Sequence, residues 1–130
     1  MKLFLKEQGM RIDLPYGELD VSGNEEYGFR PFQLMVASIA GCSASVYRKI
    51  LDKQKIDYED LIINAEVERN EMEANRIESI HLEFVVKGRY LDEGKLYKNL
   101  EVARKNCSMI RSVENSINIK ESLECIEINS

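Results

Sequence analysis

The sequence predicts an α+β fold, with mainly antiparallel sheets and a long buried central helix. Two observations support this prediction. Short segments in which apolar and polar residues alternate occur before, between and after two stretches with helical spacing. The stretch 31–54 has no proline after Pro31, and its centre is apolar or small nearly all round. This order is typical of folds in which the helices are segregated from an antiparallel sheet.

Length and composition predict one soluble domain. The chain has 130 residues, of which 44% are hydrophobic and 32% charged. Domains commonly have about 100–200 residues, so we expect a single domain over residues 1–130. The formal charge of −5 leaves no excess of cations to neutralise phosphates, which disfavours nucleic acids and anionic membranes as partners.

The lengths of the apolar stretches predict a cytoplasmic location. The apolar stretch at the start is shorter than the core of a signal peptide. We find no run of the roughly 20 apolar residues that a membrane span needs.

The first third of the chain predicts a three-stranded antiparallel meander. Apolar residues recur two positions apart, and glycine or proline bounds each pair. The pairs are Leu3 with Leu5, Ile12 with Leu14, and Leu19 with Val21. The longest helix is expected to follow over 31–54, because proline is tolerated in a first helical turn and cations suit a helix C-terminus.

The second half predicts a hairpin, a second helical region and a closing strand. Apolar residues alternate over 63–67 and again over 80–86, and the acidic stretch 68–78 is expected to be a solvated loop. Asp92 is expected to cap a helix that breaks at Asn106. Its buried stripe is expected to contain Leu96, Leu100, Ala103 and Cys107. Residues 117–128 predict one or two strands, with a bulge or turn near Glu121.

The cysteines are the only credible nucleophiles. The chain has three cysteines, Cys42, Cys107 and Cys125. An odd number of cysteines without CxxC spacing argues against a disulfide framework and against a zinc site. The single His81 is interpreted as a surface or edge residue, and no metal, flavin or haem is expected. From the residues alone, Cys42 and Cys107 are either small core residues or reactive thiols. A break at Asn106 would place Cys107 at a helix start, where unpaired N–H groups lower a thiol pKa.

Two segments resemble a known family. They are RPFQLMVASIAGCSAS (30–45) and LEVARKNCSMIRSV (100–113), whose cysteines lie 65 positions apart. Together they resemble the osmotically inducible protein C and organic hydroperoxide resistance family (OsmC/Ohr). In that family a proline and a helix of small residues lead to the first cysteine, and the second cysteine opens a later helix. The resemblance extends over the whole chain and implies a single OsmC-like domain.

The resemblance implies a thiol-dependent peroxidase, an organic hydroperoxide reductase built as an intertwined homodimer with its sites at the subunit interface. Cys42 matches the peroxidatic thiol and Cys107 the resolving thiol. The first thiolate would attack an organic hydroperoxide, the second thiol would form a disulfide with it, and an external reducing thiol would reset the pair. Apolar side chains near Cys42 would favour an alkyl peroxide. The expected substrate pocket contains Gln33, Leu34, Ile39 and Val46.

The chain departs from the family pattern before the first cysteine. Active members place a Glu a little over two turns earlier, where it holds an arginine that activates the thiolate. The stretch here is Pro31-Phe32-Gln33-Leu34, and an amide supplies no charge for an ion pair. Arg11 is the best match to the activating arginine. The missing Glu keeps an alternative open, a non-enzymatic OsmC-fold dimer that binds a small apolar ligand at the subunit interface.

Overall fold

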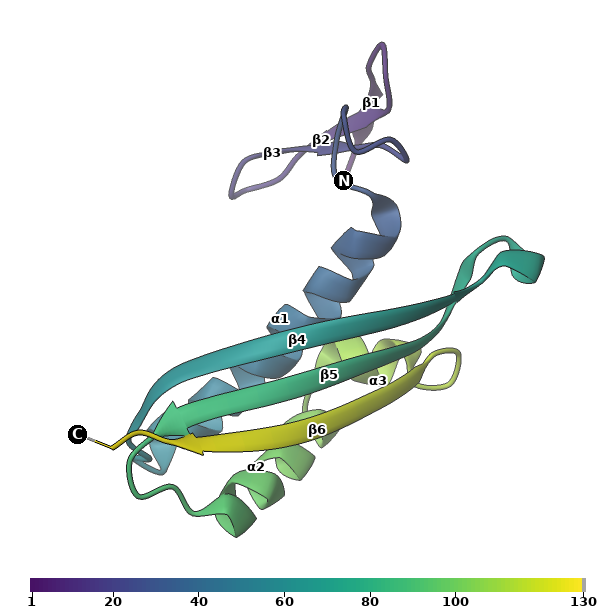
Figure 1. Ribbon diagram of the computed structural model, residues 1–130. Coiled ribbons are helices and arrows are strands. Elements are labelled where there is room, and N and C mark those ends of the chain that lie inside the picture. Colours follow the sequence, from purple (N-terminus) through teal and green to yellow (C-terminus); the bar gives the residue numbers. More distant parts are fainter. Residues whose placement is uncertain (130) are drawn as a thin grey trace. The chain divides into compact units, whose positions relative to one another are not determined.

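A computed structural model describes residues 1–129 and confirms the predicted α+β fold. The chain divides into two compact units, Met1–Ala37 (the N-terminal unit) and Ser38–Ser130 (the C-terminal unit). The elements in chain order are β1 (Leu3–Leu5), β2 (Met10–Asp13), β3 (Glu18–Val21), α1 (Pro31–Lys53), β4 (Tyr58–Asn70), the 3-10 turn η1 (Glu71–Glu73), β5 (Arg76–Gly88), α2 (Glu93–Lys105), α3 (Ser108–Val113) and β6 (Asn118–Glu127) (Figure 1).

The N-terminal unit contains the predicted meander. Its sheet has the order β1-β2-β3, and both pairs are antiparallel. Gly9 between β1 and β2 has a φ of +77°, and a Cβ there would collide with the carbonyl oxygen of Val21. This turn therefore requires a glycine.

The C-terminal unit contains a sheet of order β4-β5-β6. β4 and β5 form the predicted antiparallel hairpin, whereas β6 pairs with β5 in parallel. The strand pairs of the two sheets are mainly antiparallel, as predicted, and this one is parallel. The connection through α2 and α3 is a helical crossover, which returns the chain to the far end of the sheet and makes a parallel pair possible.

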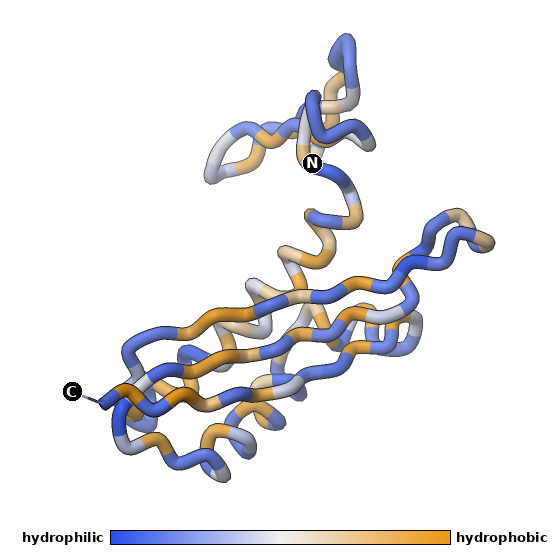
Figure 2. Tube along the Cα trace, viewed as in Figure 1, coloured by the Kyte–Doolittle hydropathy of each residue, from blue (hydrophilic) through white to orange (hydrophobic). Residues whose placement is uncertain are grey.

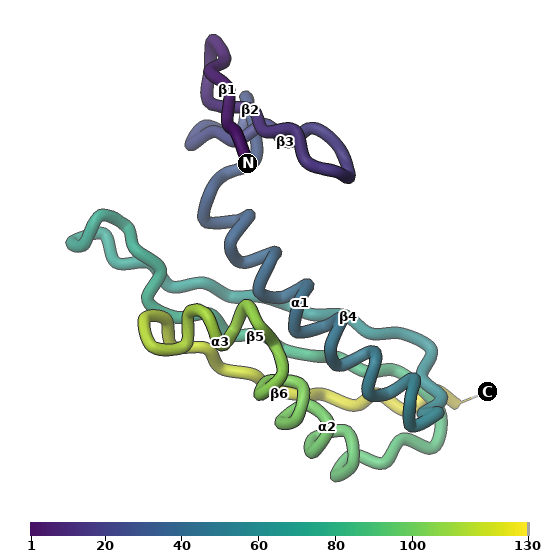
Figure 3. The backbone as a smooth tube through the Cα atoms, turned by 180° about the vertical axis from the view of Figure 1, so that it is seen from behind, coloured from purple at the N-terminus to yellow at the C-terminus, as the bar shows by residue number. Residues whose placement is uncertain are grey.

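Side chains of one face of this sheet pack under the helices. α2, α3 and the part of α1 in this unit lie on the same side of the sheet (Figures 1 and 3). Ile80, Leu82, Phe84 and Val86 of β5 are fully buried, and they alternate with His81, Glu83 and Val85. Figure 2 shows hydrophobic and hydrophilic segments on the strands of this sheet. The buried face is the one that the two-residue spacing predicts.

The acidic stretch 68–78 is not the long loop that we expected. β4 continues to Asn70 and β5 begins at Arg76, so only η1 and two left-handed residues, Ala74 and Asn75, make the turn. Glu68 and Glu78 stand on the strands themselves, and Glu71 and Glu73 lie in η1. Glu78, for example, accepts a hydrogen bond from Asn70 Nδ2 at 3.0 Å across the hairpin.

The predicted bulge or turn near Glu121 is also wrong. β6 pairs with β5 residue by residue from Asn118 to Glu127 without a register shift. Ile126 interrupts the alternation of apolar residues because it lies on the opposite face of β6 from Leu123 and Cys125. The predicted break at Asn106 is confirmed, as is the cap, because Asp92 Oδ1 accepts a hydrogen bond from Lys95 N at 3.2 Å.

Within one chain, α1 buries a single face. Its buried residues recur every three or four positions: Val36, Ile39, Ser43, Tyr47 and Leu51. Gly41 and Ser45 are exposed, although the sequence predicts a helix buried nearly all round. By length and composition α1 also meets the criterion for a membrane span, contrary to our expectation. A core helix of a soluble protein meets the same criterion.

Candidate active site

Two thiols from distant parts of the sequence meet in the C-terminal unit. α1 carries Cys42, and the corner between α2 and α3 carries Cys107. Cys42 is half-buried and Cys107 fully buried. Cys42 Sγ lies 3.7 Å from Ser108 Oγ, and the Cys107 thiol is close enough to act on the pKa of Cys42 by hydrogen bonding.

The corner has a definite backbone geometry. Asn106 ends α2, and its side-chain Nδ2 donates to the carbonyl of Val102 at 2.8 Å. Cys107 is extended and occupies the position just before α3, and its N–H donates to the carbonyl of Arg104 at 3.3 Å. No side chain caps α3, so its first N–H groups are left to interact with the sulfur atoms.

The pKa of Cys42 is lowered from the ordinary value. The largest cause is hydrogen bonding from the backbone N–H of Met109, while burial acts in the opposite direction. Hydrogen bonds from the Cys107 thiol and from Ser108 lower it further. Donors directed at a sulfur atom stabilise the thiolate, which is the nucleophilic form.

The pKa of Cys107 is raised, contrary to the expectation from its place at a helix start. Burial is the largest cause, and the backbone N–H of Ile110 opposes it only in part. The neighbouring Cys42 raises the pKa as well, because a thiol that donates to a thiolate is held in its protonated form. The N–H groups at the start of α3 thus favour the thiolate of Cys42, and Cys107 serves as a donor.

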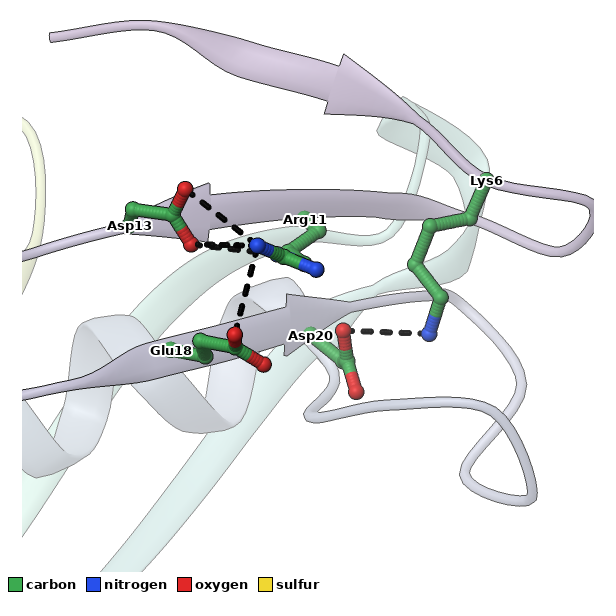
Figure 4. Close-up of polar contacts among 5 residues, drawn as sticks. All are labelled: Lys6, Arg11, Asp13, Glu18 and Asp20. Carbon is green, nitrogen blue, oxygen red and sulfur yellow. Dashed lines mark hydrogen bonds and ion pairs between the residues drawn. The ribbon is translucent and has the colours of Figure 1, made fainter.

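Arg11 lies on β2 of the N-terminal unit and is engaged by carboxylates. Its guanidinium pairs with Asp13 at 3.0 Å and with Glu18 at 3.2 Å, while Lys6 pairs with Asp20 nearby (Figure 4). All of these side chains are at least one-third exposed. The role of Arg11 as an activator of the thiolate stays a prediction.

The four expected pocket residues differ in burial. Gln33 is exposed and Leu34 half-buried in the N-terminal unit, whereas Val46 is half-buried in the C-terminal unit. Ile39 is only 1% exposed, so it already packs in the core of its own chain. A substrate pocket made by these residues stays a prediction.

The other candidate groups lie apart from the two thiols. His81 is on the outer face of the sheet, as predicted, and its Nε2 lies 2.8 Å from Ser122 Oγ. Cys125 is half-buried on the inner face of β6, and burial raises its pKa. Among residues 1–129, no three His, Cys, Asp or Glu side chains are grouped to hold a metal ion.

One buried acid was missed by the sequence analysis. The side chain of Glu121 is only 6% exposed, and its Oε2 accepts a hydrogen bond from Ser43 Oγ at 2.9 Å. Arg104 Nη1 lies 3.8 Å from its Oε1. The sequence does contain a signal for this burial. Glu121 lies two residues from both Ile119 and Leu123, so it shares a strand face with these two buried residues.

Solved structures share this fold. A hypothetical protein from Aquifex aeolicus VF5 is 25% identical, with a TM-score of 0.87, and the match covers 98% of this chain and 96% of that one. An organic hydroperoxide resistance protein OsmC from Legionella pneumophila is 20% identical, with a TM-score of 0.73 and coverage of 95% and 93%. At 20% identity, the similarity to the Legionella protein supports a shared fold only.

Sequence comparison gives the family. Protein YhfA of Escherichia coli strain K12 is 30% identical over 97 residues, which cover 74% of this chain and 72% of that protein. Residues 22–122, well over half of the chain, match the family described as OsmC-like protein. With this match and the shared fold, the chain belongs to the OsmC-like protein family.

Proposed function

We propose that this protein is a thiol-dependent peroxidase that reduces organic hydroperoxides through a Cys42/Cys107 redox pair. The observation that carries the proposal is the meeting of two cysteines far apart in sequence: Cys42 Sγ lies 3.7 Å from the hydroxyl of Ser108, the residue that follows Cys107. The opposite directions of the two pKa shifts support it. The attack on a peroxide needs the thiolate form, which the donors to Cys42 favour. Cys107 is held in its protonated form beside Cys42 and gives up its proton when it condenses with the sulfenic acid, which fits a resolving role.

The proposed cycle has three steps. The Cys42 thiolate attacks the outer oxygen of the hydroperoxide, the O–O bond breaks, and the alkoxide takes a proton to leave as an alcohol. The Cys42 sulfenic acid then condenses with the Cys107 thiol, which forms a disulfide and releases water. An external dithiol reduces the disulfide by two exchange steps and is itself oxidised to a disulfide.

We also propose that the active form is a cytoplasmic homodimer. Leu3, Phe4 and Phe29 of the N-terminal unit are each more than half exposed. α1 also leaves Gly41 and Ser45 uncovered in the C-terminal unit. Large exposed apolar side chains favour burial against a second copy of the chain, and uncovered small residues on a helix allow its backbone to approach closely. A dimer would also account for the hydropathy of α1 without a membrane.

A steady-state assay tests the activity. The protein is mixed with cumene hydroperoxide and dithiothreitol, and loss of peroxide is followed. Cys42→Ser is expected to abolish turnover. Cys107→Ser is expected to slow it, because the sulfenic acid must then react with dithiothreitol directly. Cys125→Ser is the matched control and should retain wild-type turnover. Equal consumption of peroxide by wild type and Cys42→Ser would refute the proposal.

A non-enzymatic dimer that binds a small apolar ligand is the second candidate. It is favoured by Gln33, which stands where active members have a Glu, and by the carboxylates that already engage Arg11. In this alternative both cysteines are structural. Slow and equal modification of all three thiols by iodoacetamide, together with no turnover, would support it.

A further inference from the structure

Glu121 is a carboxylate within the core of the C-terminal unit. It lies on the inner face of β6, opposite the fully buried Leu82 of β5. Oε2 accepts from the hydroxyl of Ser43, which is itself 0% exposed. Oε1 is buried, and no hydrogen-bond partner for it is present among residues 1–129. Arg104, about one-third exposed, is the nearest cation, at 3.8 Å.

The two partners of Glu121 adjoin the two candidate redox cysteines. Ser43 follows Cys42 directly on α1. The carbonyl of Arg104 accepts the N–H of Cys107 at 3.3 Å, at the end of α2. One carboxylate on the sheet therefore contacts both segments that bring the sulfur atoms together.

This arrangement has a cost in stability. Burying a carboxylate is unfavourable unless hydrogen bonds and charges compensate for the lost water. Glu121 has one hydrogen bond and one long ion pair, and its second oxygen lacks a hydrogen bond. An apolar residue at this position, like Ile119 and Leu123 on either side, would pack without this cost. The contact of Glu121 with both cysteine-bearing segments supplies a reason for the acid.

We propose that Glu121 is a positioning residue, which fixes α1 at Ser43 and the end of α2 at Arg104 so that Cys42 and Cys107 can form a disulfide. The inference rests on the proposed function, because it assumes that these two cysteines are a redox pair. Geometry of this kind acts on the disulfide equilibrium, since a bridge forms only when the Cα atoms lie within roughly 7 Å.

The test measures that equilibrium without peroxide. A Cys125→Ser parent is equilibrated with oxidised and reduced glutathione, and the ratio of dithiol to disulfide is read by mass spectrometry. Each protein disulfide formed converts one oxidised glutathione to two reduced molecules. A loss of stability that affects both redox forms equally cancels in this ratio. Five variants are made in the parent: Ser43→Ala, Glu121→Ala, the double variant that combines these two changes, Glu121→Gln and Ser45→Ala.

Ser43→Ala and Glu121→Ala should each shift the equilibrium about tenfold toward the dithiol, because either change breaks the contact that holds the Cys42 segment of α1 in position for the disulfide. The double variant should shift it no further than Glu121→Ala alone, since the contact with Ser43 is already absent in that variant. Glu121→Gln keeps an acceptor for Ser43 and should stay within about twofold of the parent. Ser45→Ala is the matched control, because the Ser45 hydroxyl bonds only to Gly41 of its own helix, and it should leave the parental value unchanged.

A parental equilibrium in Glu121→Ala would overturn the inference, as would additive shifts in the double variant. A parent that forms the disulfide with glutathione but does not reduce hydroperoxides would refute the proposed peroxidase alone. The shifts in the variants would then still decide the role of Glu121. A parent that forms no Cys42–Cys107 disulfide would refute both proposals.

Discussion

At the scale of single residues, the neighbouring thiols of Cys42 and Cys107 should titrate in opposite directions from an ordinary cysteine. The pKa of Cys42 is lowered chiefly by the N–H of Met109, and burial raises that of Cys107. Alkylation by iodoacetamide requires the thiolate. Peptide-level mass spectrometry across pH should therefore give Cys42 a midpoint below the ordinary 9.0 and Cys107 a midpoint above it.

The variant Cys107→Ala provides a control for this titration. It removes one of the donors to Cys42, so the midpoint of Cys42 should rise while remaining below the ordinary value, because Met109 still donates. Identical midpoints for all three cysteines in the wild type would contradict the electrostatic account of the site.

Glu121 makes stability depend on pH. Burial raises its pKa above the ordinary 4.5, against the opposing effects of Ser43 and Arg104. A raised carboxyl pKa contributes stability that is fully present below the unfolded value and lost as the pH rises through the folded value. Glu121→Gln cannot ionise, so its free energy of unfolding should exceed that of wild type at neutral pH. The difference should close as the pH falls toward 4.5.

Urea denaturation of both proteins between pH 4 and pH 8 measures this difference. The Arg104→Gln variant is a useful comparison, because it removes the opposing cation and should steepen the loss of stability with rising pH. Parallel pH profiles for wild type and Glu121→Gln would show that Glu121 titrates as an ordinary carboxyl.

Sequence reasoning at this scale identified both thiols, but it assigned the lowered pKa to the wrong one. The break at Asn106 correctly placed Cys107 at a helix start. Which sulfur atom receives the N–H groups depends on the packing of α1 against the corner, and spacing along the chain does not contain that information. Glu121 was missed for a related reason, since its partners lie 78 and 17 positions away in sequence.

At the scale of elements, the β4–β5 turn contains a local strain that a substitution can relieve. Ala74 has a φ of 57°, a left-handed conformation that a Cβ disfavours. Ala74→Gly should raise the free energy of unfolding by about 0.5–1 kcal/mol. Ala65→Gly in β4 is the matched control and should lower it, because glycine weakens a strand interior. Destabilisation by Ala74→Gly in thermal or urea unfolding would contradict this reading.

Most elements could be predicted from the sequence because their signals are local. The meander, α1, the hairpin and the break at Asn106 depend on apolar spacing and on capping residues such as Asp92. The parallel pairing of β6 could not be predicted, because strand direction depends on where the α2–α3 crossover returns the chain. The acidic turn was predicted too long because charged residues also occupy solvent-facing strand positions.

At the scale of the whole molecule, the proposed homodimer can be tested by its mass and by its surface residues. The exposed apolar residues Leu3, Phe4 and Phe29 and the uncovered side of α1 are the surfaces that a second copy would bury. Sedimentation equilibrium at micromolar concentration should give twice the chain mass of 15.0 kDa. Phe29→Asp should weaken the association, because it places a charge among the exposed apolar residues. A wild-type monomer would contradict the dimer.

The central claim is that one thiol is oxidised by an organic hydroperoxide and the other resolves it. The most direct measurement adds one equivalent of cumene hydroperoxide to the reduced protein, without external thiol, and maps the oxidised residues by mass spectrometry. We predict one equivalent of alcohol and a Cys42–Cys107 disulfide in the wild type, and a dimedone-trapped sulfenic acid at Cys42 in Cys107→Ser. Unconsumed hydroperoxide, or oxidation that falls equally on Cys125, would contradict the account.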